Sequence, residues 1–331
     1  MDFQLSDDQR ALRSGMRDLL DAVFDRDRMR AAVERGGTLD RSLWRELGAA
    51  GFFALRLPEE AGGVGLGLPE AVLLFEEAGR ALLPGPLVAT HLAAGLVKGA
   101  AEGEAVVTAV DGDLPVAHLA EADAVLVGAD ALAGEPLRAF VAAARPVRSM
   151  DPLTPLHRVA GRTAATEAYS GALHYEGALL TAAEQLGSAA RTTETAVQHA
   201  GDREQFGSPI GSFQAVKHLC ADMLARTEPA RAAVYAAAVT GDPVEIAAAK
   251  LLADEAAVRN ARDCLQIHGG MGFTWEADVH LHLKRAWLRS AARLGGAAAE
   301  ELLAAGLGAA RPDPGSSAAP GRGAPEAGGG G

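Results

Sequence analysis

Apolar residues recur at helical spacing along the first hundred positions of the chain. Ser6 and Gln9 predict a capping box that starts a helix, and further helices are predicted at about 43–50 and 69–82. Between these, LRLPEEAGGVGLG at 55–67 carries enough glycine and proline to force an irregular loop. Residues 1–100 are therefore predicted to form a helical domain. The apolar face of its first helix consists of Leu12, Met16, Leu19 and Val23.

The pattern changes after residue 100. AVVTAV at 105–110, PVAHLA at 115–120 and ADAVLVG at 122–128 are short apolar runs separated by turn signals, which is typical of strands. The segment is too short for an independent nucleotide-binding domain. We therefore expect residues 101–166 to form a reduced middle β domain.

Long helical patterns return after residue 166. The best marked helix has Asp242 as its expected N-cap and Pro243 at its first position, and it runs to about residue 265. Together these patterns predict an antiparallel four-helix bundle at 167–307, in a mainly α protein with a small β domain. The rest, 308–331, is rich in Gly, Pro, Ala and Ser and is predicted to be disordered. The other bundle helices are predicted at about 176–201, from 212 onward, and at about 277–305.

Composition narrows the class of protein. With 331 residues, 49% of them hydrophobic, the chain can bury a sizeable core. A net charge of -12 argues against a nucleic-acid surface, and no apolar run approaches the ~20 residues of a membrane span. The N-terminus has no secretory signal, so we expect a cytoplasmic protein. Cys220 and Cys264 are far apart in predicted helices and are interpreted as buried thiols.

The segment DREQFGSPIGSFQAVKH at 202–218 joins two predicted bundle helices. Arg203 ends the first helix, Phe206 lies in the turn, and Gln214 lies in the first turn of the next helix. A guanidinium beside an aromatic ring and a helix start suits a diphosphate and a flat heterocycle. Spacing alone equally allows an interhelical turn with one surface ion pair.

A second segment, LQIHGGMGFTWEA at 265–277, ends the helix that starts at Pro243. Gly269 and Gly270 are consistent with a helix terminator and also with a phosphate cradle. Without a Cβ, a pair of glycines lets backbone amides approach phosphate oxygens closely.

Both motifs, together with the LPEEAGGVGLG loop, resemble signatures of the acyl-CoA dehydrogenase family in the same order along the chain. The resemblance implies an N-terminal helical domain, a middle β domain and a C-terminal four-helix bundle, with FAD bound at a subunit interface. It places Arg203 at the FAD pyrophosphate and assigns the glycine pair to the same dinucleotide. The residues predicted to bind FAD are Arg203, Gln205, Phe206, Ile210, Phe213, Gln214, Gln266, Gly269 and Gly270.

Other signatures of that family are missing. Nothing between Lys98 and Ala168 resembles the TEPxxGSD-type segment or the Trp-Ile-Thr-type strand that hold the flavin ring. By the resemblance, the family's glutamate base aligns near Arg293, and its alternative position aligns near Gly177. Arginine cannot act as a general base at neutral pH. We therefore predict no catalytic residue in this chain, with Glu176 as the open alternative.

Two other clusters do not predict chemistry. His280 and His282 are two positions apart on a predicted helix, and His268 lies upstream, without a carboxylate or cysteine cluster to complete a metal site. Glu76 and Glu77 are adjacent on a helix and cannot face each other as paired carboxylates. No metal site is predicted.

These observations lead to one hypothesis and two alternatives. The chain is predicted to be the FAD-binding subunit of a heterotetrameric acyl-CoA dehydrogenase that α,β-dehydrogenates an acyl-CoA thioester. A second, related subunit would supply the glutamate base and the flavin-ring pocket, and electron-transfer flavoprotein or a similar acceptor would take the electrons. The alternatives are a non-enzymatic dimerisation scaffold and a self-sufficient flavin enzyme that uses Glu176 as its base.

Overall fold

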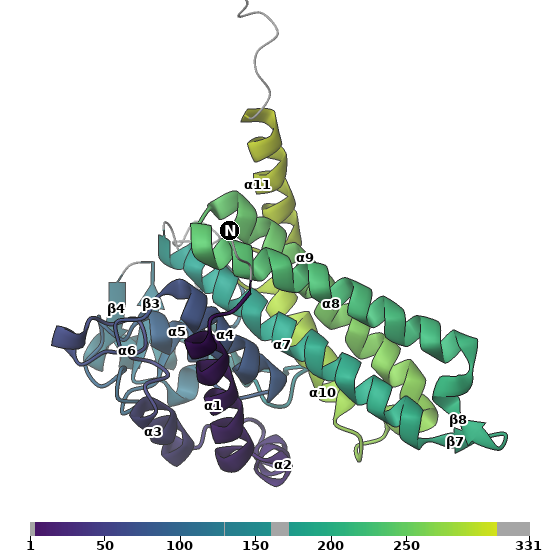
Figure 1. Cartoon of the computed structure of the whole chain (residues 1–331). Helices are drawn as coiled ribbons and strands as arrows, with labels where there is room; N and C mark the ends of the chain where they lie inside the picture. The colour runs from purple at the N-terminus through teal and green to yellow at the C-terminus, as the bar shows by residue number, and fades with distance from the viewer. Residues whose placement is uncertain (1–3, 129, 160–171, 310–331) are drawn as a thin grey trace, which may run out of the picture.

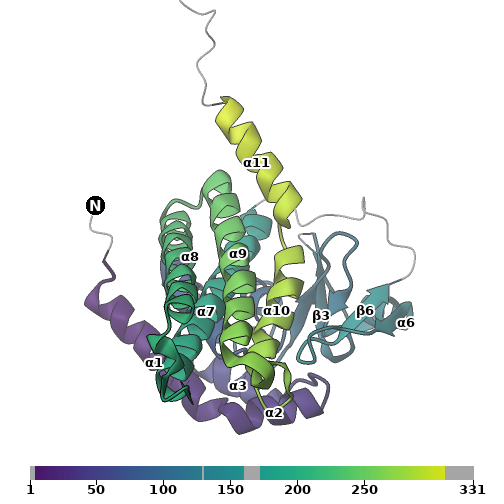
Figure 2. The ribbon, with the colours of Figure 1, turned by 90° about the vertical axis from the view of Figure 1, so that its right-hand side faces the viewer.

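The structure is a computed structural model that describes residues 4–128, 130–159 and 172–309. N-terminal helices pack against a long C-terminal bundle, and a small β region lies beside them (Figures 1 and 2). The predicted mainly helical architecture with little sheet is confirmed. The predicted domain boundary at 166–167 and residues 310–331 of the predicted tail lie outside the described residues.

The N-terminal region begins with the predicted capping box: the Ser6 side chain accepts from the Gln9 amide, and the Gln9 side chain accepts from the Ser6 amide, both at 3.1 Å. Its core is aromatic, with the rings of Trp44 and Phe53 fully buried at 4.7 Å between centroids. Two short helices, α2 and α5, were not predicted from the pattern. The elements are α1 (Asp7–Val23), α2 (Arg26–Glu34), α3 (Arg41–Ala49), η1 (Glu59–Ala61), α4 (Leu68–Arg80) and α5 (Leu87–Leu92).

Helix α4 joins this region to the bundle by crossing α7 (Ala172–Asp202) at very short range. An ideal Cβ on Gly79 would lie 2.0 Å from the Glu184 carbonyl oxygen, and one on Gly187 would lie 1.8 Å from the Glu76 carbonyl oxygen. Only glycine permits this approach of two backbones. The two regions therefore share one continuous hydrophobic core.

The middle region holds two three-stranded sheets in place of one. In the first, β1 pairs parallel with β3, which pairs antiparallel with β4; in the second, β6 pairs antiparallel with β2 and β5. The three apolar runs correspond to β1, β2 and β3. The other strands carry more exposed residues, so the hydrophobic pattern did not predict them. The elements are β1 (Val107–Ala109), β2 (Val116–Ala117), η2 (Leu119–Glu121), β3 (Ala124–Val127), β4 (Asp130–Ala133), α6 (Gly134–Ala142), β5 (Ala144–Val147) and β6 (Leu156–Val159).

The C-terminal bundle consists of α7, α8, α9 and α10, which run side by side in Figure 2. Asp242 caps α9 as predicted, since its carboxylate accepts from the amides of Val244 and Glu245. Cys264 is buried and Cys220 is half-buried, and both thiols are free. The remaining elements are β7 (Glu204–Gln205), β8 (Ser208–Pro209), η3 (Ile210–Ser212), α8 (Gln214–Thr240), α9 (Pro243–His268), η4 (Gly269–Phe273), α10 (Val279–Ala291) and α11 (Gly296–Ala309).

The prediction of one continuous fourth helix at 277–305 is wrong. Arg293 and Leu294 adopt left-handed backbone conformations, with φ of 47° and 66°, and these break the segment into α10 and α11. The Arg293 amide donates to the Asp111 carboxylate at 2.5 Å instead of continuing the helix. The helix α11 points away from the body of the molecule (Figure 1).

Candidate cofactor site

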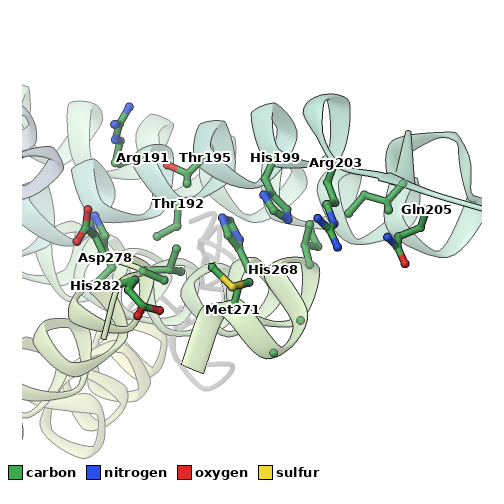
Figure 3. Close-up of a pocket in the computed structure, with 17 residues that line it drawn as sticks. Arg191, Thr192, Thr195, His199, Arg203, Gln205, His268, Met271, Asp278 and His282 are labelled. Carbon is green, nitrogen blue, oxygen red and sulfur yellow. The ribbon is translucent and has the colours of Figure 1, made fainter. Parts of the chain in front are cut away.

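A cleft of about 810 Å³ lies at one end of the bundle, between α7 and the junction of α9 with α10 (Figure 3). Both predicted motifs reach it, although some sixty residues separate them in the sequence. The residues that line this cleft are Arg191, Thr192, Thr195, His199, Arg203, Gln205, Ile210, Ile267, His268, Gly269, Gly270, Met271, Glu276, Ala277, Asp278, Val279 and His282.

One wall of the cleft is a polar stripe on α7. Arg191, Thr195 and His199 on α7, and Arg203 directly after its last residue, recur every four residues and line the cleft. Figure 3 shows His199 and Arg203 pointing toward the end of α9. Twelve residues of helix extend about 18 Å, a length that suits an extended ligand. The Arg203 side chain is exposed and forms no ion pair with any described residue. The four-residue repeat was present in the sequence and would have identified three of these residues.

The opposite wall is the end of α9. Gly269 has φ 58° and ψ -140°, a backbone conformation that essentially only glycine adopts. Gly270 has no positive φ, and a Cβ added there would meet no atom within 4 Å. The backbone conformation therefore explains the first glycine, and no contact within the described chain explains the second. Close approach of a ligand to the backbone is a physical reason for the second.

Two histidines stack across the cleft. The rings of His199 on α7 and His268 on α9 lie 4.0 Å apart between centroids, with 16° between their planes. Burial, and after it the neighbouring His268 and Arg203, lower the pKa of His199, which favours its neutral form. His268 Nδ1 lies 2.8 Å from the Cys264 carbonyl oxygen, which fixes that ring. In the sequence, His268 suggested only a metal ligand, and no pattern predicted this pair.

The structure gathers only part of the predicted set in the cleft. Arg203, Gln205, Ile210, Gly269 and Gly270 line it. The other four predicted residues lie on exposed surfaces around it. Phe206, at the tip of the β7–β8 hairpin, is 94% exposed, and its ring packs edge-on to that of Phe213 with 6.2 Å between the centroids. Gln214 is the first residue of α8, and Gln266 lies on the outer face of α9.

The two positions of the family's glutamate meet in space. An ideal Cβ on Gly177 would lie 2.6 Å from Nη1 of Arg293, so the arginine side chain fills the space above this glycine. Glu176 points elsewhere, because its carboxylate pairs with Arg56 at 2.7 Å. Among the described residues, the place where the family's carboxylate is expected therefore holds a guanidinium.

Members of the histidine and glutamate clusters, which were not expected to form chemical sites, contact other side chains. His282 Nδ1 lies 2.8 Å from the Ser188 hydroxyl, and Glu77 pairs with Arg17 at 2.6 Å. No group of three or more His, Cys, Asp or Glu residues in the described part of the chain could hold a metal ion. Within the same residues, no helix is long and apolar enough to cross a membrane.

The architecture is that of the acyl-CoA dehydrogenases. A solved glutaryl-coenzyme A dehydrogenase complex shares the fold with a TM-score of 0.80, covering 94% of this chain and 98% of that chain at 21% identity. Sequence models of the acyl-CoA dehydrogenase N-terminal and C-terminal domains match residues 6–102 and 167–299. The chain belongs to the acyl-CoA dehydrogenase family, as the two motifs predicted.

Individual relatives are also similar. Acyl-CoA dehydrogenase IpdE2 of Mycobacterium tuberculosis is 39% identical over 78% of this chain and 84% of its own length. The protein of the same name from Mycolicibacterium smegmatis is 37% identical over 85% of this chain and 93% of its own length. A chain of the ChsE4-ChsE5 complex from Mycobacterium tuberculosis has a TM-score of 0.78 and 25% identity, covering 95% of this chain and 100% of that one.

Proposed function

We propose that this chain is the FAD-binding subunit of a heteromeric acyl-CoA dehydrogenase that catalyses α,β-dehydrogenation of an acyl-CoA thioester. The observation that carries the proposal is the cleft, where residues of both family motifs converge. The family supplies the reaction class, and the residues of the cleft supply the reason to expect FAD.

The donors of the cleft fit the diphosphate end of FAD. Arg203 is exposed and forms no ion pair with the described residues, so its guanidinium is available to a pyrophosphate. The amides at Gly269 and Gly270 would donate from the opposite wall, where no Cβ blocks approach. When bound, FAD would accept a hydride from the substrate Cβ. The role of this chain would be to bind and orient the adenosine-diphosphate half.

A second subunit is required because this chain offers no base at the expected position. Arg293 lies against Gly177, and a guanidinium holds its proton at neutral pH. The sequence also lacks the family segments that hold the flavin ring. The similar ChsE4-ChsE5 complex consists of two different chains, which supports an assembly of that kind. The partner's glutamate would remove the α-proton. Electron-transfer flavoprotein or a similar acceptor would take the electrons, as predicted from the sequence.

The test is co-expression with a longer acyl-CoA dehydrogenase chain that carries both the ring-binding segment and the glutamate. We expect flavin absorbance and acyl-CoA-dependent dye reduction from the pair and from neither chain alone. In the pair, Arg203→Ala should weaken FAD binding roughly ten- to hundredfold, the effect of losing a charge-assisted hydrogen bond. The matched control is Arg138→Ala, which removes an exposed arginine 71% accessible on α6 and should leave the FAD content unchanged.

Three results would overturn the proposal. Flavin bound and reduced by this chain alone would favour the self-sufficient enzyme, and no flavin in any assembly would favour the scaffold. Unchanged FAD affinity in Arg203→Ala would exclude a role of the cleft in FAD binding. Glu176→Gln distinguishes the self-sufficient enzyme from the heteromer. The self-sufficient enzyme needs this carboxylate, whereas the heteromer should keep its turnover because Glu176 pairs with Arg56.

A further inference from the structure

The two stacked histidines of the cleft, His199 and His268, have hydrogen-bonding capacity that the chain does not use. Both are half-buried and line the cleft, and Figure 3 shows their rings facing each other. The ring centroids are 4.0 Å apart. Neither ring nitrogen of His199 has a hydrogen-bond partner among the described residues. A proton can therefore be added to this histidine pair without breaking a contact of His199.

The ring of His268 also has one nitrogen free to accept a proton. Its Nδ1 lies 2.8 Å from the Cys264 carbonyl oxygen, and a carbonyl oxygen only accepts hydrogen bonds. Nδ1 therefore carries the hydrogen, and Nε2 is the basic nitrogen of the neutral ring. Nε2 has no hydrogen-bond partner in the part of the chain that the structure describes. Protonation of Nε2 would leave the contact with Cys264 in place.

The cations of the chain disfavour a proton on the histidine pair. Burial is the largest cause of the lowered pKa of His199, His268 and Arg203 lower it further, and only Asp202 opposes them. Arg191 is another cation in the same wall of the cleft. Two charged imidazoles at 4.0 Å would repel each other, so we expect the pair to hold no more than one proton.

The remaining carboxylates near the cleft provide little compensating charge. Asp278 lines the cleft but forms ion pairs with Arg26 and Arg30. Glu276 and Glu204 are exposed, so water screens their charges. The negative charge that would favour a proton on the histidine pair therefore has to come from a ligand.

The other titratable groups that pack around the cleft stay neutral. Burial lowers the pKa of His282 at the α10 wall to about 3. Burial also raises the pKa of the Cys264 thiol on α9 to about 12, and it raises the pKa of Cys220, which packs in the same cluster from α8. At neutral pH, His199 and His268 are therefore the groups of this cleft whose charge a bound anion could change.

We propose that the histidine pair takes up one proton when a diphosphate binds in the cleft, so that FAD binds more tightly as the pH falls. Because FAD is taken as the ligand, this assignment rests on the proposed function. An anion within about 4–6 Å of an imidazole favours its charged form. A phosphate paired with Arg203 would also weaken the repulsion between that guanidinium and a proton on His199. Both effects raise the proton affinity of the pair in the bound state.

Linkage fixes the direction of the pH dependence. The histidine pair is more basic in the bound state than in the free state, so binding takes up a proton at a pH between the two titrations. Affinity therefore increases as the pH falls through that range, by at most about tenfold per pH unit for one proton. The diphosphate diester of FAD lacks the second ionisation of a phosphate monoester, so the ligand does not contribute to this dependence.

The experiment is calorimetric titration of FAD into the flavin-free, co-expressed heteromer at about pH 6 and about pH 8, the range in which histidine titrates. Each titration is repeated in two zwitterionic buffers of different ionisation enthalpy, because the difference in apparent enthalpy counts the protons taken up. We expect FAD to bind roughly five- to tenfold more tightly at the lower pH, with uptake of up to about one proton for each FAD.

Variants assign the proton to the histidine pair. The double variant His199→Gln with His268→Gln keeps polar side chains that do not titrate, and it should bind FAD equally at both pH values without proton uptake. If it does not fold, His199→Gln alone leaves the contact of His268 with Cys264 intact and should reduce the proton uptake. The matched control is His218→Gln on α8, an exposed histidine outside the cleft, which should keep the wild-type pH dependence.

The outcomes separate this assignment from the proposed function. Equal FAD affinity of the wild type at both pH values, without proton uptake, would overturn the assignment and leave the proposed function standing. Wild-type pH dependence in the histidine variants would overturn it as well, because the proton would then belong to another group. Failure of FAD to bind at either pH would overturn the proposed function, and the assignment with it.

Discussion

The cleft and a second cavity of about 210 Å³, which lies between α5, the two small sheets, α7 and α10 and is called the inner cavity, both involve α7 and α10. Their arginines are nevertheless held in opposite ways. In the cleft, Arg203 is exposed and makes no ion pair with the described residues. In the inner cavity, Arg285 and Arg289 are buried, and each is paired with a carboxylate of the same chain. An exposed arginine can bind a ligand with little loss of solvation energy. The charge of a buried arginine must be balanced by an ion-pair partner for the chain to fold.

The comparison extends to the positions that identify the family. The glycine pair faces open space at the cleft, while Gly177 faces the Arg293 side chain beside the inner cavity. The glycine backbone at the cleft is therefore open to approach, whereas a guanidinium fills the space above Gly177. Substitutions at Arg203 and at Arg289 should therefore separate ligand binding from stability.

The largest effect is expected at the buried arginine. Arg289→Met leaves Glu184 buried without its guanidinium partner, and such a loss typically costs about 3–5 kcal/mol of unfolding free energy. Arg203→Met should change that free energy by less than about 0.5 kcal/mol, because its side chain is exposed. Urea unfolding of both variants measures the difference.

The matched control for Arg289→Met is the double variant Glu184→Met with Arg289→Met. It removes both charges, so it should recover most of the lost stability. Similar losses for Arg289→Met and Arg203→Met would contradict the contrast between the two sites. A double variant as unstable as the single one would show that the ion pair is not the cause.

A smaller effect is expected from acid, at His282, which lines the cleft. Burial lowers the pKa of His282 from 6.5 to about 3, and this side chain is 8% exposed. Below pH 6.5 the unfolded chain binds a proton that the folded chain refuses, so this stability is complete above pH 6.5 and is lost as the pH falls. At about two pH units below that value the loss is roughly 3 kcal/mol.

Replacing His282 with Gln tests this assignment. The variant should lose less unfolding free energy than the wild type when urea unfolding at neutral pH is compared with unfolding two pH units below 6.5. His91 and His280, whose pKa values burial lowers to about 4, keep part of the acid sensitivity in both proteins. The control Leu283→Met should lower stability equally at both pH values. An unchanged pH dependence in His282→Gln would exclude His282 as a cause.

Helical periodicity and capping residues predicted most of the fold. Ser6 and Asp242 cap helices as expected, because a cap is a local interaction between a side chain and nearby amides. The break after α10 was missed, since it depends on Asp111, which is distant in the sequence and accepts from the Arg293 amide. Strands with exposed residues were missed for a related reason: their pairing partners, and not their own pattern, define them.

The candidate site was predictable only in part. The motifs identified Arg203 and the glycine pair because both lie at helix ends, where spacing is informative. The stacking of His199 on His268 joins two helices and has no signature in either one. The Arg285 and Arg289 nitrogens that have no hydrogen-bond partner among the described residues are likewise a property of tertiary packing, since the sequence shows only two arginines four residues apart.

The smallest effect on stability is expected at Gly270. Its backbone has no positive φ and its Cβ would meet nothing within 4 Å, so Gly270→Ala should change the unfolding free energy by less than about 0.5 kcal/mol. Gly269→Ala should cost about 1–3 kcal/mol, because alanine resists its φ of 58° and ψ of -140°. Urea unfolding of the two variants separates a glycine required by the fold from one that the fold does not require.

The same Gly270→Ala variant sharpens the assignment of the cleft. If an FAD phosphate lies against this backbone, the added methyl group should lower the FAD content of the co-expressed pair although stability is unchanged. The control is Gly15→Ala in α1, another glycine whose Cβ would meet nothing within 4 Å, which should leave the FAD content at the wild-type level. Full FAD content in Gly270→Ala would mean that the second glycine ends the helix without approaching the cofactor, and the cradle would then consist of Gly269 and Arg203.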